Sequence, residues 1–315
     1  MNPTLKVHQS IANFSPGQQV SILTIGTFDG VHIGHQKIIE RLNQIKELKN
    51  ERSVILTFFP HPRRVLDHSQ DIRMLTTMEE KIKLLDRFGL DHLIIEPFTR
   101  EFSRLSALDF VRDILVNKLH IRKLVIGYDH RFGKNREGNF DQLTEYGELY
   151  GFDVEMITAQ EIQNVSVSST KIRRAIENGD MHTANTYLGY NYLLTGPVIK
   201  GQGIGRKINF PTVNLEIEES YKLIPKNGVY TVRASFDATR VFGIMNIGFR
   251  PTVGGTARTI EIHLLDYEGD LYGKRLQVEV LHRIRDEKKF RDITELSEEI
   301  RKDEMTARSW LSNFK

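Results

Sequence analysis

Residues 21–35 read SILTIGTFDGVHIGH, a short apolar run followed by a glycine-rich turn. The run Ser21–Ile25 is rich in β-branched residues and predicts a buried strand. Apolar residues at helical spacing then predict a helix over Ile33–Lys49. A strand, a glycine-rich turn and a helix in this order are typical of an α/β unit, in which ligands bind at the carboxyl end of the strand.

The same alternation continues through the first half of the chain. We expect further strands at four apolar runs, Ser53–Phe58, His92–Ile95, Lys123–Gly127 and Phe152–Met156. Helical spacing predicts four more helices, Met78–Phe88 (capped by Thr77), Ser106–Leu119, Asp141–Tyr150 and Ser169–Glu177. Strands that alternate with helices indicate an α/β, Rossmann-like domain with a parallel sheet covered on both faces.

The pattern changes in the second half, where short apolar runs are separated by turn signals. We expect five strands, Tyr192–Ile199, Val229–Phe236, Val241–Ile247, Arg258–Asp266 and Leu276–Ile284. A helix capped by Thr294 is expected to follow over Thr294–Leu311. This spacing predicts an antiparallel barrel or sandwich. The length of 315 residues fits two domains, which we place at residues 1–184 and 185–315.

The composition excludes several classes of protein and of site. The chain has no cysteine, which rules out disulfides, thiolate zinc sites, iron–sulfur clusters and cysteine nucleophiles. Its 44 basic and 41 acidic residues give a net charge of +3, too balanced to indicate a nucleic-acid partner. No apolar stretch approaches the ~20 residues that cross a bilayer, and residues 1–10 lack the layout of a signal peptide. We therefore expect a cytoplasmic protein with no membrane partner.

The turn between the first strand and the first helix carries the strongest chemical signal. His32 and His35 lie about one helical turn apart, so both imidazoles can face the same ligand oxygens. The neighbouring glycines let the backbone approach a ligand, and the helix N-terminus offers N–H groups to a phosphate. This pattern indicates phosphoryl or nucleotidyl transfer, with imidazole donors stabilising charge at phosphorus. A metal site and a purely structural turn are the alternatives, and the chain has no GxxxxGK[ST] loop.

Three other segments in the first half have chemical potential. Ser168–Arg173 (SSTKIR) opens a helix, where hydroxyls act as caps and Arg173 can hold a triphosphate or pyrophosphate. Gly127–Gly133 (GYDHRFG) brings an acid, cations and aromatic rings to the same edge of the sheet. Thr57–Pro62 (TFFPHP) can pack a flat ring. Simple helix capping explains the first segment, and core packing of the two phenylalanines explains the third, without any ligand.

The second half contains its own candidate site. Gly201–Arg206 (GQGIGR) is not followed by a helical pattern, so a flap over phosphates fits it better than a dinucleotide loop. Thr212 and Asn214 lie two apart in an extended segment, share a face and offer oxygen ligands to Mg²⁺. Glu261 alternates with apolar residues and can take a proton from a substrate hydroxyl. The alternatives are a hairpin turn with ordinary polar residues and a solvated acid.

The motifs of the first half together resemble a known family. HIGH at 32–35 and SSTKIR resemble the HIGH and ISSTxxR motifs of the nucleotidylyltransferase superfamily. With TFFPHP and GYDHRFG, this half is similar to the adenylyltransferase module of bacterial bifunctional riboflavin kinase/FAD synthetases. The resemblance implies transfer of AMP from ATP to FMN with release of pyrophosphate, and a catalytic role for His32, His35 and Arg173. It implies ATP or phosphate contacts from Gly26, Phe28, Asp29, Gly30, Gly34, Ser168, Ser169 and Thr170. It implies flavin contacts from Phe59, Pro60, His61, Tyr128, Asp129 and Arg131, with His130 where the family usually has Phe.

The second half resembles the riboflavin kinase module of the same enzymes. The strings INFPTVN, NIGFRPT, DLYG and RDEKKF correspond to its motifs, with Asn209 for the usual Gly and Val213 for the usual Ala. The resemblance implies a six-stranded antiparallel barrel with a closing helix. It also implies Mg-ATP binding by Thr212 and Asn214, and activation of the ribityl 5′-hydroxyl by Glu261. Implied ATP or phosphate contacts are Gly201, Gly203, Gly205, Arg206 and Pro211, and implied flavin contacts are Asn246, Arg250, Arg285 and Phe290.

We therefore expect a bifunctional enzyme of flavin cofactor synthesis. Its C-terminal half makes FMN from riboflavin and ATP with Mg²⁺, its N-terminal half makes FAD from FMN and ATP, and it is a monomer or weak oligomer. A nucleotidylyltransferase of another pathway and a flavin-binding module without turnover are the alternatives. The barrel half argues against the first, and the intact sets of catalytic residues argue against the second.

Overall fold

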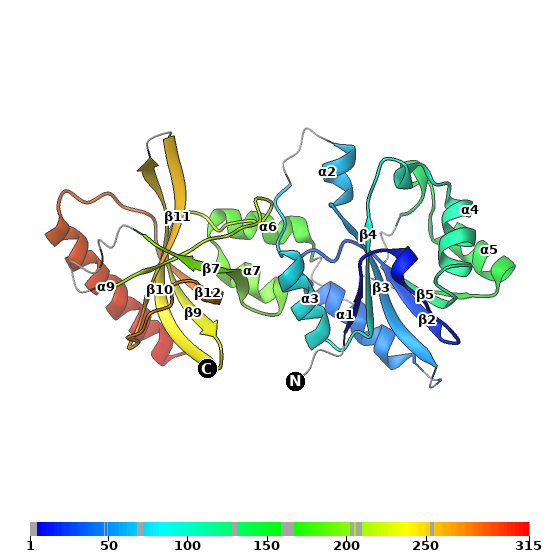
Figure 1. The fold of residues 1–315 in the computed structure, drawn as a ribbon, viewed down its shortest axis with the longest axis horizontal. Coiled ribbons are helices and arrows are strands. Elements are labelled where there is room, and N and C mark those ends of the chain that lie inside the picture. The colour runs from blue at the N-terminus through cyan, green and yellow to red at the C-terminus, as the bar shows by residue number, and fades with distance from the viewer. Residues whose placement is uncertain are drawn as a thin grey trace. The chain divides into compact units, whose positions relative to one another are not determined.

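The computed structural model describes residues 5–46, 48, 50–67, 72–127, 131–158, 167–201, 205, 210–252 and 255–314 (Figure 1). The chain forms two compact units, Met1–Ser168 and Ser169–Lys315. The first unit contains the predicted parallel sheet and the second contains the predicted barrel. The division between them precedes the boundary that we expected after residue 184.

The first unit is built on a six-stranded parallel sheet with the strand order β1-β4-β3-β2-β5-β6. Its strands are β1 (Lys6–His8), β2 (Val20–Ile25), β3 (Glu51–Phe59), β4 (His92–Pro97), β5 (Ile121–Gly127) and β6 (Asp153–Ile157). The parallel sheet is thus confirmed. The strand β1 was not predicted, because a strand of three residues is too short to show a period.

Within the described residues of this unit, five α-helices, three short 3₁₀ turns and one π-helix connect these strands. The helices are α1 (Ile33–Gln44), α2 (Pro62–Leu66), α3 (Met78–Arg87), α4 (Ala107–Asp109) and α5 (Phe140–Tyr150). The turns are η1 (Ile11–Asn13), η2 (Phe102–Arg104), η3 (Phe110–Val116, a π-helix that continues α4) and η4 (Lys134–Arg136). Thr77 caps α3 as predicted, since its hydroxyl accepts the N–H of Glu80 and the Glu80 carboxylate accepts the N–H of Thr77.

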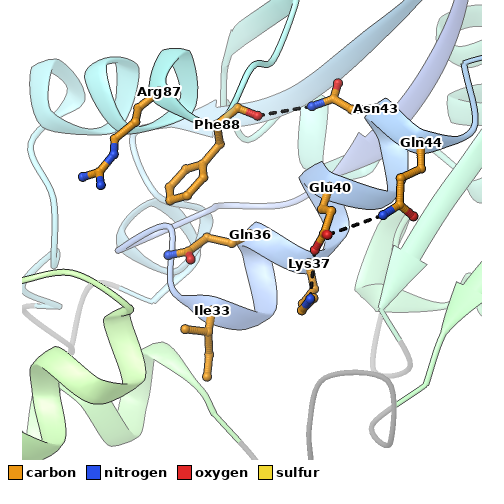
Figure 2. Close-up of a pocket in the computed structure, with 8 residues that line it drawn as sticks. All are labelled: Ile33, Gln36, Lys37, Glu40, Asn43, Gln44, Arg87 and Phe88. Atoms are coloured by element: carbon orange, nitrogen blue, oxygen red, sulfur yellow. Dashed lines mark hydrogen bonds and ion pairs between the residues drawn. The ribbon is translucent and has the colours of Figure 1, made fainter.

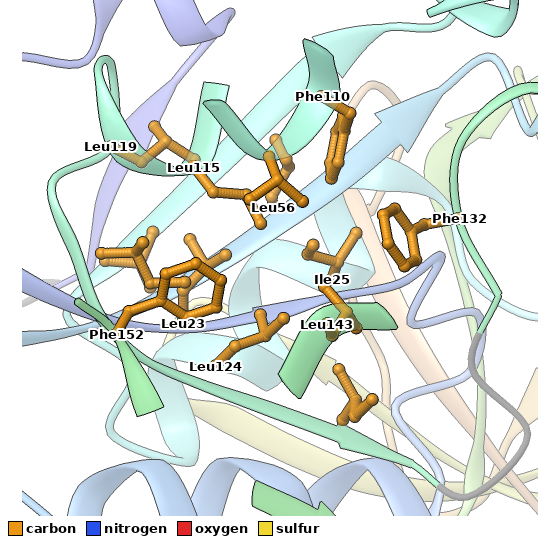
Figure 3. Close-up of a cluster of buried hydrophobic side chains, with 14 of the residues drawn as sticks. Leu23, Ile25, Leu56, Phe110, Leu115, Leu119, Leu124, Phe132, Leu143 and Phe152 are labelled. Atoms are coloured by element: carbon orange, nitrogen blue, oxygen red, sulfur yellow. The ribbon is translucent and has the colours of Figure 1, made fainter. Parts of the chain in front are cut away.

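Helices cover both faces of the sheet (Figure 1). On one face, alternate residues such as Leu23 and Leu56 pack against Phe110 of η3 and Leu143 of α5 (Figure 3). On the other face, α1 contacts β2, β3 and β5. Each fully buried aliphatic side chain contributes roughly 1.5–3 kcal/mol. The carboxyl edge of the sheet is therefore a rigid platform for the loops that follow the strands.

The described residues of the second unit form a closed antiparallel barrel and three helices. The strand order around the barrel is β10-β11-β8-β7-β12-β9. The strands are β7 (Tyr192–Ile199), β8 (Val213–Leu215), β9 (Gly228–Phe236), β10 (Thr239–Thr252), β11 (Gly255–Leu264) and β12 (Arg275–Arg285). The helices are α6 (Ser169–Asn178), α7 (Met181–Leu188) and α9 (Ile293–Ser312). This confirms the barrel and settles it against a sandwich.

Three details of this unit differ from the expectation. The short strand β8 was not predicted as a strand. The cap of α9 is Asp292, whose carboxylate accepts two backbone N–H groups, whereas we expected Thr294. The helices α6 and α7 belong with the barrel, because α7 contacts β7 and β12, and Asn185 accepts the N–H of Tyr192 and donates to the carbonyl of Val280. Within the described ranges, no helix is both long and apolar enough to span a membrane.

Candidate active sites

The loop over residues 26–32 leaves the sheet where the strand order reverses. The neighbours of β2 are β3 on one side and β5 on the other, so connections leave this point in opposite directions. Ligands of open α/β sheets bind at such a switch point, outside the carboxyl ends of the strands. The helix α1 begins directly after the loop, with His32 at its N-cap. The fold thus directs the N-terminal N–H groups of a helix at the place where a ligand is expected.

The two histidines of this loop lie face to face. The ring centroids of His32 and His35 are 3.7 Å apart, with 16° between their planes, and the Phe28 ring lies 4.7 Å from that of His35. Loss of solvation, and then the charges of His32 and Lys81, hold the pKa of His35 well below its usual value of 6.5. His35 is therefore neutral at pH 7 and can donate or accept a hydrogen bond. The predicted juxtaposition of the two imidazoles is confirmed.

The loop has a strained backbone that its surroundings hold in place. Phe28 and Val31 have φ values of 46° and 37°, a region that costs a non-glycine residue of order 1–3 kcal/mol. Both side chains are completely buried, which fixes the backbone on either side of Gly30 (φ 81°). A Cβ atom at Gly26 would lie 3.1 Å from the Phe28 ring, so the glycine lets that ring pack. Such strain is typical of functional loops.

Asp29 and Phe28 are buried, whereas the family resemblance implies that both contact ATP or phosphate. The Asp29 carboxylate is fully buried and accepts the N–H groups of Leu75 (2.9 and 3.1 Å) and Thr76 (3.3 Å). The Thr76 hydroxyl in turn accepts the N–H of Gly30 at 3.3 Å. Asp29 therefore fixes the loop to the segment before α3, and the buried Phe28 ring lies against the His35 ring. Two neighbours of the loop, Thr76 and Lys81, had no motif that could have indicated them.

The predicted SSTKIR motif opens α6, as expected. The helix begins at Ser169, with Thr170 exposed and Ser168, Ser169 and Arg173 partly exposed. Ile172, between them, is fully buried. From Ser169 onward the motif belongs to the second compact unit, whereas Ser168 and the histidine loop belong to the first.

The predicted flavin contacts of the first unit, and the ring next to them, differ in exposure and in the contacts that they make. Phe58 packs against Phe98 and Phe102 at 5.5 and 5.4 Å between ring centroids, so core packing explains this ring. Phe59 at the end of β3 is 37% exposed and Pro60 is exposed. The His61 imidazole caps α2 by accepting the N–H of Arg63. Arg131 is exposed, whereas Tyr128, Asp129 and His130 lie outside the described residues.

A surface hollow of about 640 Å³ runs along α1 and the end of α3 (Figure 2). Among its polar side chains, Glu40 accepts from Lys37 and Gln44, and Asn43 donates to the carbonyl of Phe88. No residue of the loop 26–32 lines it. The hollow therefore does not include the histidine loop.

Three polar residues face one another across adjacent strands of the barrel. Glu261 of β11 pairs with Asn246 of β10 on one side and with Asn214 of β8 on the other. Residues directly opposite in an antiparallel pair share a face, so these side chains form one row. The Thr212 hydroxyl donates to the Glu261 carboxylate at 3.4 Å. The structure thus brings Glu261 together with Thr212 and Asn214, which lie in a distant segment of the sequence.

The segment before Thr212 is fitted closely to this row. A Cβ atom at Gly201 would lie 2.1 Å from the Asn214 amide nitrogen, and one at Gly205 would lie 2.2 Å from the Phe210 carbonyl oxygen. Pro211 is exposed, and its carbonyl accepts a hydrogen bond of 2.9 Å from Nδ1 of His263. Gly203 and Arg206 lie outside the described residues. The two described glycines are therefore required by close approach.

The donors in this row suit a hard cation. A hydroxyl, an amide and a single carboxylate supply oxygen atoms, which Mg²⁺ prefers while keeping waters and substrate phosphates in its shell. The described parts of the chain contain no group of three or more His, Cys, Asp or Glu side chains that could hold a metal by themselves. The set therefore fits a cation that arrives with a nucleotide.

The predicted flavin contacts of the barrel also differ in the contacts that they make. The Arg285 guanidinium makes a bidentate bond to Asp303 of α9 (2.8 and 2.7 Å) and lies 5.8 Å from the Phe290 ring centroid. Its main contact therefore ties α9 to β12. The side chain of Arg250 lies outside the described residues. Glu287 was not predicted as a site residue, although it stands in the quoted RDEKKF string. Its carboxylate accepts from the N–H of Phe249 (3.1 Å) and from the Asn227 side chain (3.0 Å).

Comparisons with known proteins agree over both units. A family model described as FAD synthetase matches residues 15–171, and one described as riboflavin kinase matches residues 188–311. The chain is 36% identical over 308 residues to a bifunctional riboflavin kinase/FMN adenylyltransferase of Escherichia coli K12, covering 97% of this chain and 98% of that protein. A protein of the same name from Listeria monocytogenes is 35% identical over 313 residues, 99% of each chain. A crystal structure described as a macrolide-efflux protein from Streptococcus pneumoniae superposes with a TM-score of 0.88 at 26% identity, covering 98% of this chain and 99% of that one.

Proposed function

The chain belongs to the family of bifunctional riboflavin kinase/FMN adenylyltransferases, and from this premise we propose which residues perform each reaction. The C-terminal half phosphorylates riboflavin to FMN with ATP. The N-terminal half adenylates FMN to FAD and releases pyrophosphate. We place the functional boundary at 184/185, so that the SSTKIR motif serves the adenylyl transfer although α6 packs with the barrel.

The stacked pair His32–His35 at the N-terminus of α1 is the observation that supports the adenylyl-transfer site. The FMN phosphate is already an anion, so its attack on the α-phosphorus of ATP needs no strong base. What the reaction requires is positioning and donors for the charge that builds on the phosphorus oxygens. A neutral His35 and the helix N–H groups supply such donors without bringing a proton that titrates near neutral pH. Arg173 and the hydroxyls of Ser168, Ser169 and Thr170 hold the departing pyrophosphate in this proposal.

The row Asn246–Glu261–Asn214 supports the kinase site. Glu261 accepts the proton of the ribityl 5′-hydroxyl, while Thr212 and Asn214 offer oxygen ligands to Mg²⁺ of Mg-ATP. When bound, the cation neutralises phosphate charge during transfer. Asn246, one strand away on the same face, is the flavin contact of this group, together with Phe290. Phe59, Pro60, His61 and Arg131 at the carboxyl edge of the sheet are proposed to contact the flavin of the other site, along with Tyr128 and Asp129.

The assignment predicts that each activity can be removed alone. With riboflavin, ATP and Mg²⁺, His32→Ala should accumulate FMN without FAD, and Glu261→Ala should make FAD from supplied FMN but no FMN from riboflavin. Chromatography of the flavins measures both. His182→Ala and Glu268→Ala change an exposed imidazole and an exposed carboxylate elsewhere and should leave both rates intact. Loss of both activities in a folded His32→Ala protein, or an unaltered kinase rate in Glu261→Ala, would refute the assignment.

A further inference from the structure

A buried lysine lies behind the histidine loop and has no part in the mechanism above. Lys81 of α3 is only 3% exposed, and its ammonium donates a 2.7 Å hydrogen bond to the Thr27 carbonyl. Lysine is almost never this buried unless its charge has a partner. The partner here is a backbone group of the loop that carries His32 and His35. Burial of the Lys81 ammonium therefore costs free energy, and the hydrogen bond that it makes is to this loop.

Lys81 belongs to a bracing system that holds the loop from the α3 side. The Thr57 hydroxyl of β3 also donates to the Thr27 carbonyl, at 3.2 Å. Two residues further on, Asp29 accepts the N–H groups that precede α3. Phe28 lies between these two fixed points, with its strained φ of 46°. Without them, the loop could relax toward ordinary backbone angles and carry the imidazoles with it.

The charged and titratable groups around Lys81 come from three elements. Asp29 of the loop attracts its proton, and His35 of α1, stacked on His32, feels its positive charge. On α3 itself, the Glu80 carboxylate accepts the N–H of Thr77 in the capping box. Burial dominates and lowers the pKa of Lys81 from 10.5 to about 8. The ammonium is thus charged at neutral pH and loses its proton within an accessible range.

We propose that Lys81 is a positioning residue for adenylyl transfer: it fixes the loop through Thr27 and adds positive charge to the region that receives the nucleotide phosphates. This inference rests on the proposed assignment of that reaction to the histidine loop. It does not involve the kinase site, which lies on other strands. FAD formation should therefore depend on the protonation of Lys81, and FMN formation should not.

The contribution of Lys81 to the stability of the protein changes with pH in the opposite direction to FAD formation. A fall in FAD formation can therefore be told apart from alkaline unfolding. Between pH 8 and pH 10.5 the unfolded chain holds more protons at this lysine than the folded chain. The contribution of Lys81 to the free energy of unfolding therefore rises with pH in that range. A fall in FAD formation through pH 8 without a fall in stability is the expected signature.

The experiment follows both rates on either side of pH 8 in the full-length protein. Wild-type FAD formation from FMN and ATP should fall with an apparent pKa near 8, whereas FMN formation in the same preparation should not show this limb. Lys81→Met should lower FAD formation by about 10²-fold at neutral pH and abolish the limb. Lys81→Arg should move the limb to higher pH, because a guanidinium stays charged. Lys83→Met removes an exposed lysine that pairs with Glu79 on the same helix and should resemble wild type.

The kinase rate and the far-ultraviolet circular dichroism of each variant report whether it is folded. The proposal is overturned if wild-type FAD formation has no alkaline limb near pH 8, a result that needs no variant. It is also overturned if folded Lys81→Met forms FAD at the wild-type rate, or if the limb persists unchanged in either Lys81 variant. Absence of FAD formation by the wild-type protein at every pH would instead refute the proposed function.

Discussion

Gly201→Ala should disable the kinase without unfolding it. The added Cβ atom would lie 2.1 Å from Nδ2 of Asn214 and 2.7 Å from its Cγ, whereas ordinary contact begins at 3.4 Å. The Asn214 amide must therefore retreat by about 1.3 Å. Because this amide is the free end of a flexible side chain, it can rotate away at small cost to the fold. The displaced group is the proposed Mg-ATP ligand that shares a face with Glu261.

The size of the effect follows from that displacement. Misplacing a reacting or ligating group by roughly 1 Å costs about 10²-fold in rate. Gly201 has no positive φ that would strain an alanine, so the change in unfolding free energy should stay within about 1 kcal/mol. We therefore expect FMN formation from riboflavin to fall about 10²-fold while FAD formation from supplied FMN is unchanged.

The assay compares Gly201→Ala with three other proteins. Lys200→Ala changes the exposed neighbouring side chain and should behave as wild type. Asn214→Ala should lose a similar factor in kinase rate. The double variant should be no worse than Asn214→Ala, because the alanine acts only through the amide that is already gone. Unaltered kinase activity in Gly201→Ala, or effects that multiply in the double variant, would refute the reasoning.

Three further substitutions test other buried contacts of the two units. Asp303→Asn should lower the free energy of unfolding of the barrel unit by about 3 kcal/mol, because it leaves the Arg285 charge without its bidentate partner; denaturation followed by the single tryptophan measures this, and an unchanged midpoint would contradict it. His92→Gln should make the free energy of unfolding depend less on pH below neutrality. Burial and then His8 hold the pKa of His92 at about 4, so between that pH and 6.5 the unfolded chain binds a proton at this residue that the folded chain does not. Unfolding free energies from neutral pH to pH 5 decide, and an unchanged slope would argue against this origin. Asp29→Asn should cost about 1–3 kcal/mol of stability and slow FAD formation, because the buried N–H groups lose a charged acceptor; an equal fall in FMN formation would place its effect elsewhere.

Long periodic segments were predictable from the sequence, and short or irregular ones were not. The helix α3 and its Thr77 cap follow from spacing and capping chemistry alone. The strands β1 (Lys6–His8) and β8 (Val213–Leu215) have three residues each, so pairing with longer neighbours creates them and no local pattern announces them. The packing of α6 and α7 with the barrel was not predicted, because a helical pattern does not show which core the apolar face of a helix joins.

The candidate sites were predictable to a similar degree. The residues themselves indicated the pairing of His32 with His35, since one helical turn separates them. The approach of Thr212 to Glu261 depends on strand order, which local spacing cannot supply; there the family resemblance carried the prediction. Lys81 and Glu287 act on backbone groups of distant segments, and no sequence pattern records such a contact.

The contacts that fix the histidine loop explain how an acidic side chain can stand in a loop that we propose as the binding site of a polyphosphate. An exposed carboxylate there would repel the nucleotide. Asp29 is instead completely buried, its charge compensated by the N–H groups of Leu75 and Thr76 and by the nearby ammonium of Lys81. At the proposed site the ligand would therefore meet the imidazoles and helix N–H groups, while the carboxylate acts on the backbone behind them. On this argument, the acid in the GTFDG turn serves as an anchor for the loop, and its removal should loosen the catalytic geometry more than it relieves any repulsion.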